Sequence, residues 1–175
     1  EALALTRKAL AEHPDRPLFE AAFQRDGVLV RADLLLLEAD GYRLREVKAS
    51  TRVKDEHRED CAIQAWVIGA ALPLSGVELA HVDTAFVYPG DGDYHGLLKS
   101  NPLDGDVASL LSAVPQWIAD ARANLAGAEP AIAIGPQCHS PYECPFQSHC
   151  GADQPLQPDY PLDCLPRLSG QRLQG

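Results

Sequence analysis

The stretch Val28-Leu-Val-Arg-Ala-Asp-Leu-Leu-Leu-Leu37 decides the fold of this chain, because its apolar residues predict a central β-strand. A hairpin signal stands on each side of it, Asp26-Gly27 before and Asp40-Gly41 after. The flanking segments 18–23 and 42–48 are therefore predicted to be strands that pair with the central one. Three antiparallel strands joined by two short turns form a meander.

Helical patterns lie on both sides of this meander. Residues 1–13 predict a helix that Pro14 ends, and apolar residues recur at helical spacing from about residue 54 to residue 70. Residues 77–88 predict a further strand, and residues 104–127 predict a helix that Pro115 kinks. We therefore expect an α/β fold with a mixed α+β sheet, followed from residue 130 by an irregular tail rich in Pro and Cys.

Length and composition describe one ordinary globular domain. The chain has 175 residues, of which 46% are hydrophobic and 23% charged. No apolar run approaches the roughly 18 residues that a membrane span needs. Five cysteines without a secretory signal favour a reduced, cytoplasmic protein over a disulfide framework. The opening residues resemble the middle of a helix, so we expect residues 1–129 to be a core that lacks an N-terminal portion, and 130–175 to be a tail.

The charge is unevenly distributed. The net charge of −10 disfavours a nucleic-acid partner, whose phosphates attract basic proteins. However, eleven of the fifteen Lys and Arg residues lie in the first sixty positions. A polyanion meets the local field rather than the net charge. The distribution therefore permits a nucleic-acid substrate without requiring one.

Three ionisable residues on neighbouring predicted strands form the candidate active site. Asp33 interrupts an apolar strand, where an unpaired acid is costly. Glu46 and Lys48 are two residues apart on the next strand, so their side chains share a face. Two hard oxygen ligands and one ammonium on one face suit Mg²⁺ or Mn²⁺. Lys48 would orient a water molecule or stabilise developing negative charge.

The alternative is that these charges are structural. An acid-x-Lys triplet is common in chains of this size, and a Glu–Lys pair on an exposed strand is ordinary. The next helix argues against this alternative. His57, Asp60 and Gln64 form one polar stripe, and Gln64 enters the apolar stretch Ala62–Ile68. A buried amide is costly without a partner, so Gln64 is predicted to form a specific hydrogen bond.

Asp33, Glu46-Val-Lys48 and Gln64 together resemble the motifs of the PD-(D/E)XK nuclease superfamily. The similarity is greatest to its RecB-type branch, which includes CRISPR-associated exonucleases and AddB-like nucleases, and it covers about residues 15–150. Residues 18–64 are especially similar to a RecB-type family that pairs this core with a cysteine-rich tail. The resemblance implies a restriction-endonuclease-like core that hydrolyses DNA phosphodiester bonds.

The resemblance also implies residue roles. Asp33, Glu46 and the carbonyl group of Val47 would hold the metal, and Lys48 would be catalytic. Gln64 would be the glutamine of a Q-x-x-x-Y motif, although the chain has Ile68 in place of the tyrosine. RecB-type enzymes usually add a His or Glu from upstream. Our candidate is Glu20, with an ordinary edge-strand carboxylate as the equal alternative and His13 as a weaker candidate.

Several basic residues follow or surround the Glu-x-Lys motif. Arg52, Lys54 and Arg58 are the candidates for contacts with backbone phosphates, which position DNA without reading bases. Arg43 and Arg45 are further candidates. Arg45 adjoins Glu46 along the strand and must therefore point to the opposite face.

The tail places Cys138, Cys144 and Cys150 at two equal spacings in a segment with little other means of folding. Three thiolates suggest a metal centre, and Cys144-Pro145 is typical of iron–sulfur ligation. Nuclease relatives with a [4Fe–4S] cluster take three ligands from such a tail and one from upstream of the core. The fourth ligand would come from a preceding region or a partner, with Cys164 as a substitute. There are two alternatives: a Zn²⁺ site completed by His139 or His149, and a plain set of reduced thiols. The remaining cysteine, Cys61, is predicted to be a buried apolar residue.

Two functions from different classes remain open on the sequence. The first is a metal-dependent DNA nuclease, exonuclease-like in action. The second is a nuclease-like fold kept as a nucleic-acid-binding or scaffold module with a structural iron–sulfur or zinc centre. The acidic C-terminal half and the missing tyrosine favour the second, whereas the retained carboxylates and lysine favour the first. A zinc-stabilised domain of unrelated function is a third possibility.

Overall fold

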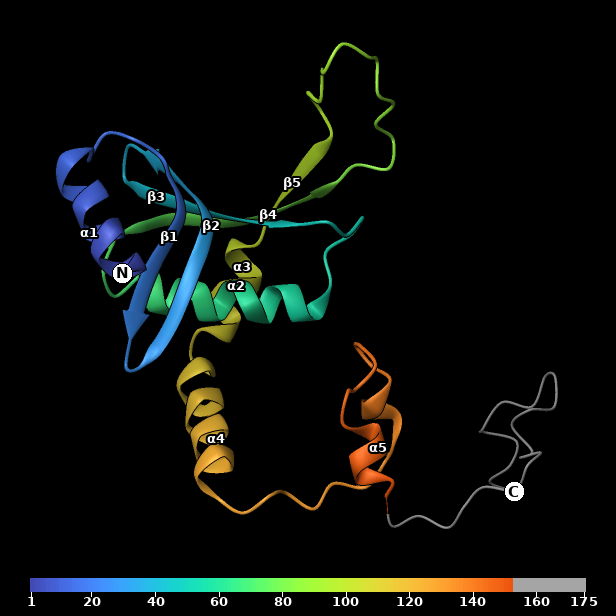
Figure 1. Ribbon diagram of the computed structural model, residues 1–175. Coiled ribbons are helices and arrows are strands. Elements are labelled where there is room, and N and C mark those ends of the chain that lie inside the picture. The colour runs from blue at the N-terminus through green and yellow to red at the C-terminus, as the bar shows by residue number, and fades with distance from the viewer. Residues whose placement is uncertain (153–175) are drawn as a thin grey trace. The chain divides into compact units, whose positions relative to one another are not determined.

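Three antiparallel strands form the first part of a five-stranded sheet (Figure 1). β1 (Leu18–Arg25) pairs with β2 (Val28–Glu38), and β2 pairs with β3 (Gly41–Lys48). Asp26 and Gly27 have φ values of 46° and 74°, the positive values that a tight two-residue hairpin requires at both central positions. The predicted meander is confirmed.

A crossover helix then connects two parallel strands of the sheet. α2 (Asp55–Ile68) connects β3 to β4 (Leu74–Val82), which runs parallel to β3. β5 (Leu98–Pro102) pairs antiparallel with β4 and gives the strand order β1-β2-β3-β4-β5. The fold is therefore a mixed α+β arrangement, as expected.

Two boundaries differ from the sequence prediction around this second half of the sheet. The strand predicted over 77–88 starts three residues earlier and ends at Val82, because a Gly- and Asp-rich segment follows it. β5 was not predicted. Its sequence, Leu-Lys-Ser-Asn-Pro, lacks apolar alternation and ends in proline, which a sheet tolerates on an edge strand.

The helix predicted over 104–127 is two helices. α3 (Asp104–Leu110) and α4 (Val114–Ala126) are separated by residues 111–113. Pro115 lies in the first turn of α4, where the missing N–H group would have no helical partner. The predicted kink is therefore wrong: the proline begins a new helix and does not bend a continuous one.

The core lies between the sheet and α2, which contacts β1, β2 and β4. Leu35, Leu44, Ile68 and Leu79 are fully buried there. α1 (Ala2–Glu12) packs on β1, where the buried Thr6 hydroxyl accepts a hydrogen bond of 2.8 Å from the Ala22 N–H. The hydrogen bond from Lys48 Nζ to Asp60 Oδ2 links the C-terminal end of β3 to α2.

The computed structural model describes residues 1–152. The chain divides into one unit spanning 1–128 and another spanning 129–175, where the sequence predicts a boundary after residue 129. In the described part of the second unit, the regular elements are the short 3₁₀ helix η1 (Pro136–Cys138) and α5 (Gln147–Cys150). No helix within residues 1–152 is long and apolar enough to cross a membrane.

Candidate active site

Asp33 stands where the β2–β3 ladder ends. The last paired residues are Leu34 and Arg45, and the next pair would be Asp33 with Glu46. Instead, the Asp33 Oδ2 atom accepts a hydrogen bond of 2.8 Å from the Val47 N–H. A side-chain carboxylate has taken the place of a main-chain acceptor. This bond fixes the Asp33 carboxylate near Glu46.

Glu46 is the buried acid of the site, with 5% of its surface exposed. Its Oε1 atom accepts a hydrogen bond of 2.7 Å from Lys48 Nζ, and its Oε2 atom accepts one of 2.8 Å from Gln64 Nε2. Burial raises the pKa of Glu46; these two hydrogen bonds oppose the rise, and the negative charge of Asp33 adds to it. The pKa of Glu46 is raised overall, so additional positive charge beside Glu46 would stabilise its ionised form.

Lys48 joins β3 to α2. Its Nζ atom donates to Glu46 Oε1 and to Asp60 Oδ2, each at 2.7 Å. Burial lowers the pKa of Lys48, but the hydrogen bonds to Asp60 and Glu46 outweigh it, so the pKa is raised overall. Lys48 is therefore a fixed ammonium group near neutral pH. It can donate hydrogen bonds and stabilise negative charge, but it cannot accept a proton.

Gln64 confirms the prediction of a buried, specifically bonded amide. It is 5% exposed, and its Nε2 atom donates to Glu46 and, at 3.4 Å, to Asp60 Oδ1. Turning the amide over would place its oxygen against two carboxylates, so the amide orientation is set chemically. Gln64 Oε1 is then left buried and without a hydrogen-bond partner in the described part of the chain. The site therefore contains a buried hydrogen-bond acceptor, Gln64 Oε1, to which none of the described residues donates.

Asp60 is the member of the cluster that the sequence prediction missed as a site residue. It lies one turn before Gln64 on α2 and contacts both Lys48 and Gln64. The signal that could have identified it was its place in the polar stripe between His57 and Gln64. His57 has a structural role: its Nδ1 atom accepts from the Lys54 N–H at 3.3 Å and caps α2. Burial lowers the pKa of His57.

Glu20 does not join this cluster. The β1–β2 pairing skips from Phe19 to Ala21, and Glu20 itself has a φ of 52°. Its carboxylate lies 2.7 Å from Arg31 Nε, and 59% of its side chain is exposed. This local distortion directs Glu20 to solvent, where it forms an ordinary surface ion pair.

The basic residues near the site are mostly balanced by carboxylates. Arg58 pairs with Asp55 and Asp106, and Lys54 pairs with Glu56. Arg52 is exposed. On β3, Arg43 pairs with Glu38, and Arg45 pairs with Glu78. These ion pairs weaken the local positive field expected from sequence. The role of Arg52, Lys54 and Arg58 in binding phosphates stays a prediction.

The donor chemistry at Asp33 and Glu46 fits a hard divalent cation. Both groups are carboxylates, and the pKa of Glu46 is raised chiefly by burial, with a smaller contribution from the negative charge of Asp33. Gln64 Oε1 has no donor among residues 1–152. Within residues 1–152, however, no three His, Cys, Asp or Glu side chains are grouped as a metal site. Lys48 Nζ lies against Glu46 Oε1, a position that a cation would also favour.

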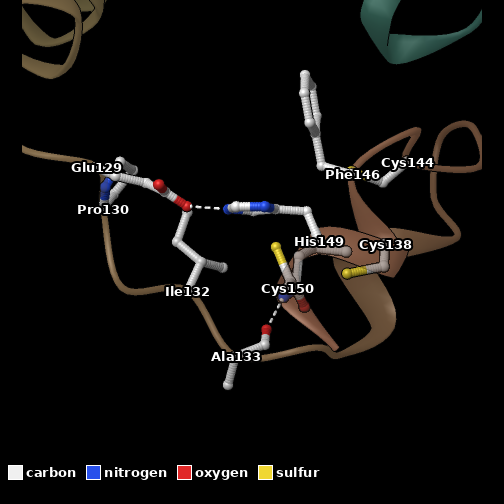
Figure 2. Close-up of a pocket in the computed structure, with 10 residues that line it drawn as sticks. Glu129, Pro130, Ile132, Ala133, Cys138, Cys144, Phe146, His149 and Cys150 are labelled. Atoms are coloured by element: carbon white, nitrogen blue, oxygen red, sulfur yellow. Dashed lines mark hydrogen bonds and ion pairs between the residues drawn. The ribbon is translucent and has the colours of Figure 1, made fainter. Parts of the chain in front are cut away.

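The tail cysteines line one pocket of about 550 Å³ in the second unit (Figure 2). Cys138 is buried, Cys144 is half-buried and Cys150 is exposed; all three are free thiols. The Cys144 N–H donates to the Cys138 carbonyl oxygen at 2.8 Å, which draws the two residues together. The cysteines share a cavity without forming a closed ligand set. Cys164 lies outside the described residues.

The two tail histidines each face a carboxylate. His149 Nε2 lies 2.6 Å from Glu129 Oε1, and His139 Nδ1 lies 2.9 Å from Glu143 Oε2.

Cys61 is fully buried in the first unit, and burial raises the pKa of its thiol to about 12. Cys61 is therefore a small apolar core residue, as predicted.

Comparisons with known proteins identify no family. No family model matches the chain, and no curated protein sequence matches it. The solved structure of SSO0001 is similar at 12% sequence identity and a TM-score of 0.32, over 66% of this chain. The match spans 57% of the SSO0001 chain. A likeness this low establishes neither a shared fold nor a shared function.

Proposed function

We propose that this chain is a metal-dependent nuclease of the PD-(D/E)XK superfamily, RecB-type, which hydrolyses DNA phosphodiester bonds and is exonuclease-like in action. The observation that carries the proposal is the buried Glu46 carboxylate, which lies near Asp33 and is bonded to Lys48 and Gln64. A raised carboxyl pKa with a specific charged partner is characteristic of functional sites. The order of meander, crossover helix and parallel strand is compatible with the restriction-endonuclease-like core that the sequence resemblance implies.

The proposed roles follow from the chemistry of each group. Asp33, Glu46 and the Val47 carbonyl group would hold Mg²⁺ or Mn²⁺, which when bound supplies Lewis acidity at the scissile phosphate. The Lys48 ammonium group would stabilise negative charge that develops on the phosphate oxygens. Gln64 holds the Glu46 carboxylate in place through Nε2. Arg52, Lys54 and Arg58 would contact the DNA backbone.

For the tail, we propose a structural [4Fe–4S] cluster held by Cys138, Cys144 and Cys150. The shared pocket of these thiols supports a common centre. The fourth ligand would come from a preceding region of the protein or from a partner. Zn²⁺ is the alternative, and anaerobic purification separates the two, because an iron–sulfur protein is brown and a zinc protein is colourless.

The nuclease proposal is tested by degradation of single- and double-stranded DNA with added Mn²⁺. Lys48→Ala is expected to lower the rate by about 100-fold or more, the usual loss when a group that stabilises transition-state charge is removed. DNA binding is expected to persist. Lys8→Ala, on the exposed face of α1, is the matched control and keeps full activity. A wild-type chain that degrades no DNA with metal present would refute the proposal.

A second candidate is a catalytically weak nucleic-acid-binding or scaffold module. Ile68, which replaces the motif tyrosine, is fully buried in the core and cannot contact a substrate. The ion pairs of Arg43, Arg45 and Arg58 also limit phosphate binding. DNA binding by the wild-type chain without metal-dependent cleavage would support this candidate.

A further inference from the structure

Lys48 is held between two carboxylates that differ in their surroundings. The distance from Nζ is 2.7 Å to Glu46 Oε1 and 2.7 Å to Asp60 Oδ2. The Glu46 side chain is 7% exposed, whereas the Asp60 side chain is 41% exposed. An ion that keeps contact with water bears its charge at a lower desolvation cost. The Asp60 carboxylate therefore keeps contact with water, whereas the Glu46 carboxylate is largely withdrawn from it.

The ammonium group and a divalent cation would compete for the same atom. The proposed metal ligand Glu46 has both carboxylate oxygens engaged, Oε1 by Lys48 and Oε2 by Gln64. Two positive charges a few ångströms apart on one buried carboxylate repel each other strongly, because screening is weak inside the protein. Lys48 must therefore loosen its bond to Glu46 when the cation binds.

We propose that Asp60 is a positioning residue that receives the Lys48 ammonium group when a divalent cation takes the Glu46 carboxylate. This inference rests on the proposed function, since it requires a cation at Asp33 and Glu46. Asp60 Oδ2 already accepts a hydrogen bond from Lys48, so the ammonium group keeps an anionic partner without leaving the site. The contact of Asp60 Oδ1 with Gln64 Nε2, at 3.4 Å, ties the same carboxylate to the amide that holds Glu46.

Without Asp60, Glu46 would be the remaining carboxylate partner of Lys48 within this cluster. The ammonium group would then hold Glu46 more tightly and resist the incoming cation. Asp60→Asn is therefore expected to weaken Mn²⁺ binding by about tenfold, within the range of coupling measured between contacting groups. In a Lys48→Ala background the competitor is absent, so the same substitution is expected to weaken binding by less than about threefold.

The experiment is isothermal titration of the full chain with Mn²⁺ alone, on the wild type, Asp60→Asn, Lys48→Ala and the double variant. Glu59→Gln removes the same charge from an exposed position on the same helix and is expected to leave Mn²⁺ affinity unchanged. Asp60→Glu restores a carboxylate and is expected to recover most of the affinity. Thermal unfolding of each variant verifies that it is folded.

The double-variant comparison gives distinct outcomes. A large loss in the wild-type background with a small loss beside Lys48→Ala supports the proposal. Equal losses in both backgrounds overturn it, because Asp60 would then act on the cation directly or through Gln64, and not through Lys48. Failure of the wild-type chain to bind Mn²⁺ refutes the proposed metal site itself, and this inference with it. If Mn²⁺ binds and the coupling is present but DNA is not cleaved, the nuclease proposal fails and the role of Asp60 stands.

Discussion

Replacing Gln64 by leucine separates the contribution of this residue to folding from its contribution to the site. Leucine has nearly the same volume, so the substitution removes the amide without opening a large cavity. Two atoms are affected. Nε2 donates to the Glu46 carboxylate at 2.8 Å, and Oε1 is buried without a partner in the described part of the chain.

The two changes affect the free energy of unfolding in opposite directions. A hydrogen bond to a charged group stabilises a fold by about 1.5–3 kcal/mol, and Gln64→Leu forfeits it. A buried, unsatisfied acceptor destabilises a fold by about 1–3 kcal/mol, and the substitution removes it. These terms nearly cancel. The free energy of unfolding of Gln64→Leu in metal-free buffer is therefore expected to lie within about 1 kcal/mol of the wild type.

The site should respond quite differently. Glu46 would lose the donor that orients Oε2, and losing such a supporting bond typically lowers metal affinity or activity by about 10–100-fold. The assays are urea denaturation followed by circular dichroism, and Mn²⁺-dependent DNA cleavage. Gln116→Leu, at an exposed position of α4, is the matched control for both measurements. Destabilisation of Gln64→Leu by more than about 3 kcal/mol would refute this reasoning, because Oε1 would then have a donor in the folded protein.

Two further predictions concern titration and thiol reactivity. Hydrogen bonds from Arg43 and Ser75 lower the pKa of Glu38, so the stability from this group is present above its unfolded pKa and is lost as pH falls through the folded pKa. The melting temperatures of the wild type and Glu38→Gln should therefore converge in acid, and a constant difference at all pH values would contradict this. Burial raises the pKa of Cys61 to about 12, so alkylation of the native, metal-free chain, mapped by mass spectrometry, should spare Cys61 and modify Cys150. Equal labelling of both would contradict the burial of Cys61.

The first three strands were predictable because local signals agree there. The Asp26-Gly27 turn and the apolar run after it specify both the turn type and the pairing register. β5 and the break before α4 were not predictable on the same basis. β5 is a strand through its pairing with β4, and Pro115 is compatible with either a kink or a new helix start until packing decides.

The candidate site was partly predictable for a similar reason. Periodicity places Glu46 and Lys48 on one face of a strand and Gln64 on the buried side of a helix, so the face on which each residue lies follows from local rules. Asp60 required tertiary information, because only the docking of α2 brings its carboxylate to Lys48. Glu20 failed to join them because the strand is irregular at that residue, and nothing in its neighbours signals the positive φ.

α2 carries both polar site residues and buried core residues on one continuous helix. Gln64 and Ile68 are one turn apart, so the amide that holds Glu46 is anchored by a side chain that is wholly enclosed. Inserting or deleting one residue between them would rotate the polar groups by about 100° and pull the apolar ones out of the interior at the same time. Length variation in α2 should therefore be far rarer than in the segment between β4 and β5, where it would disturb neither.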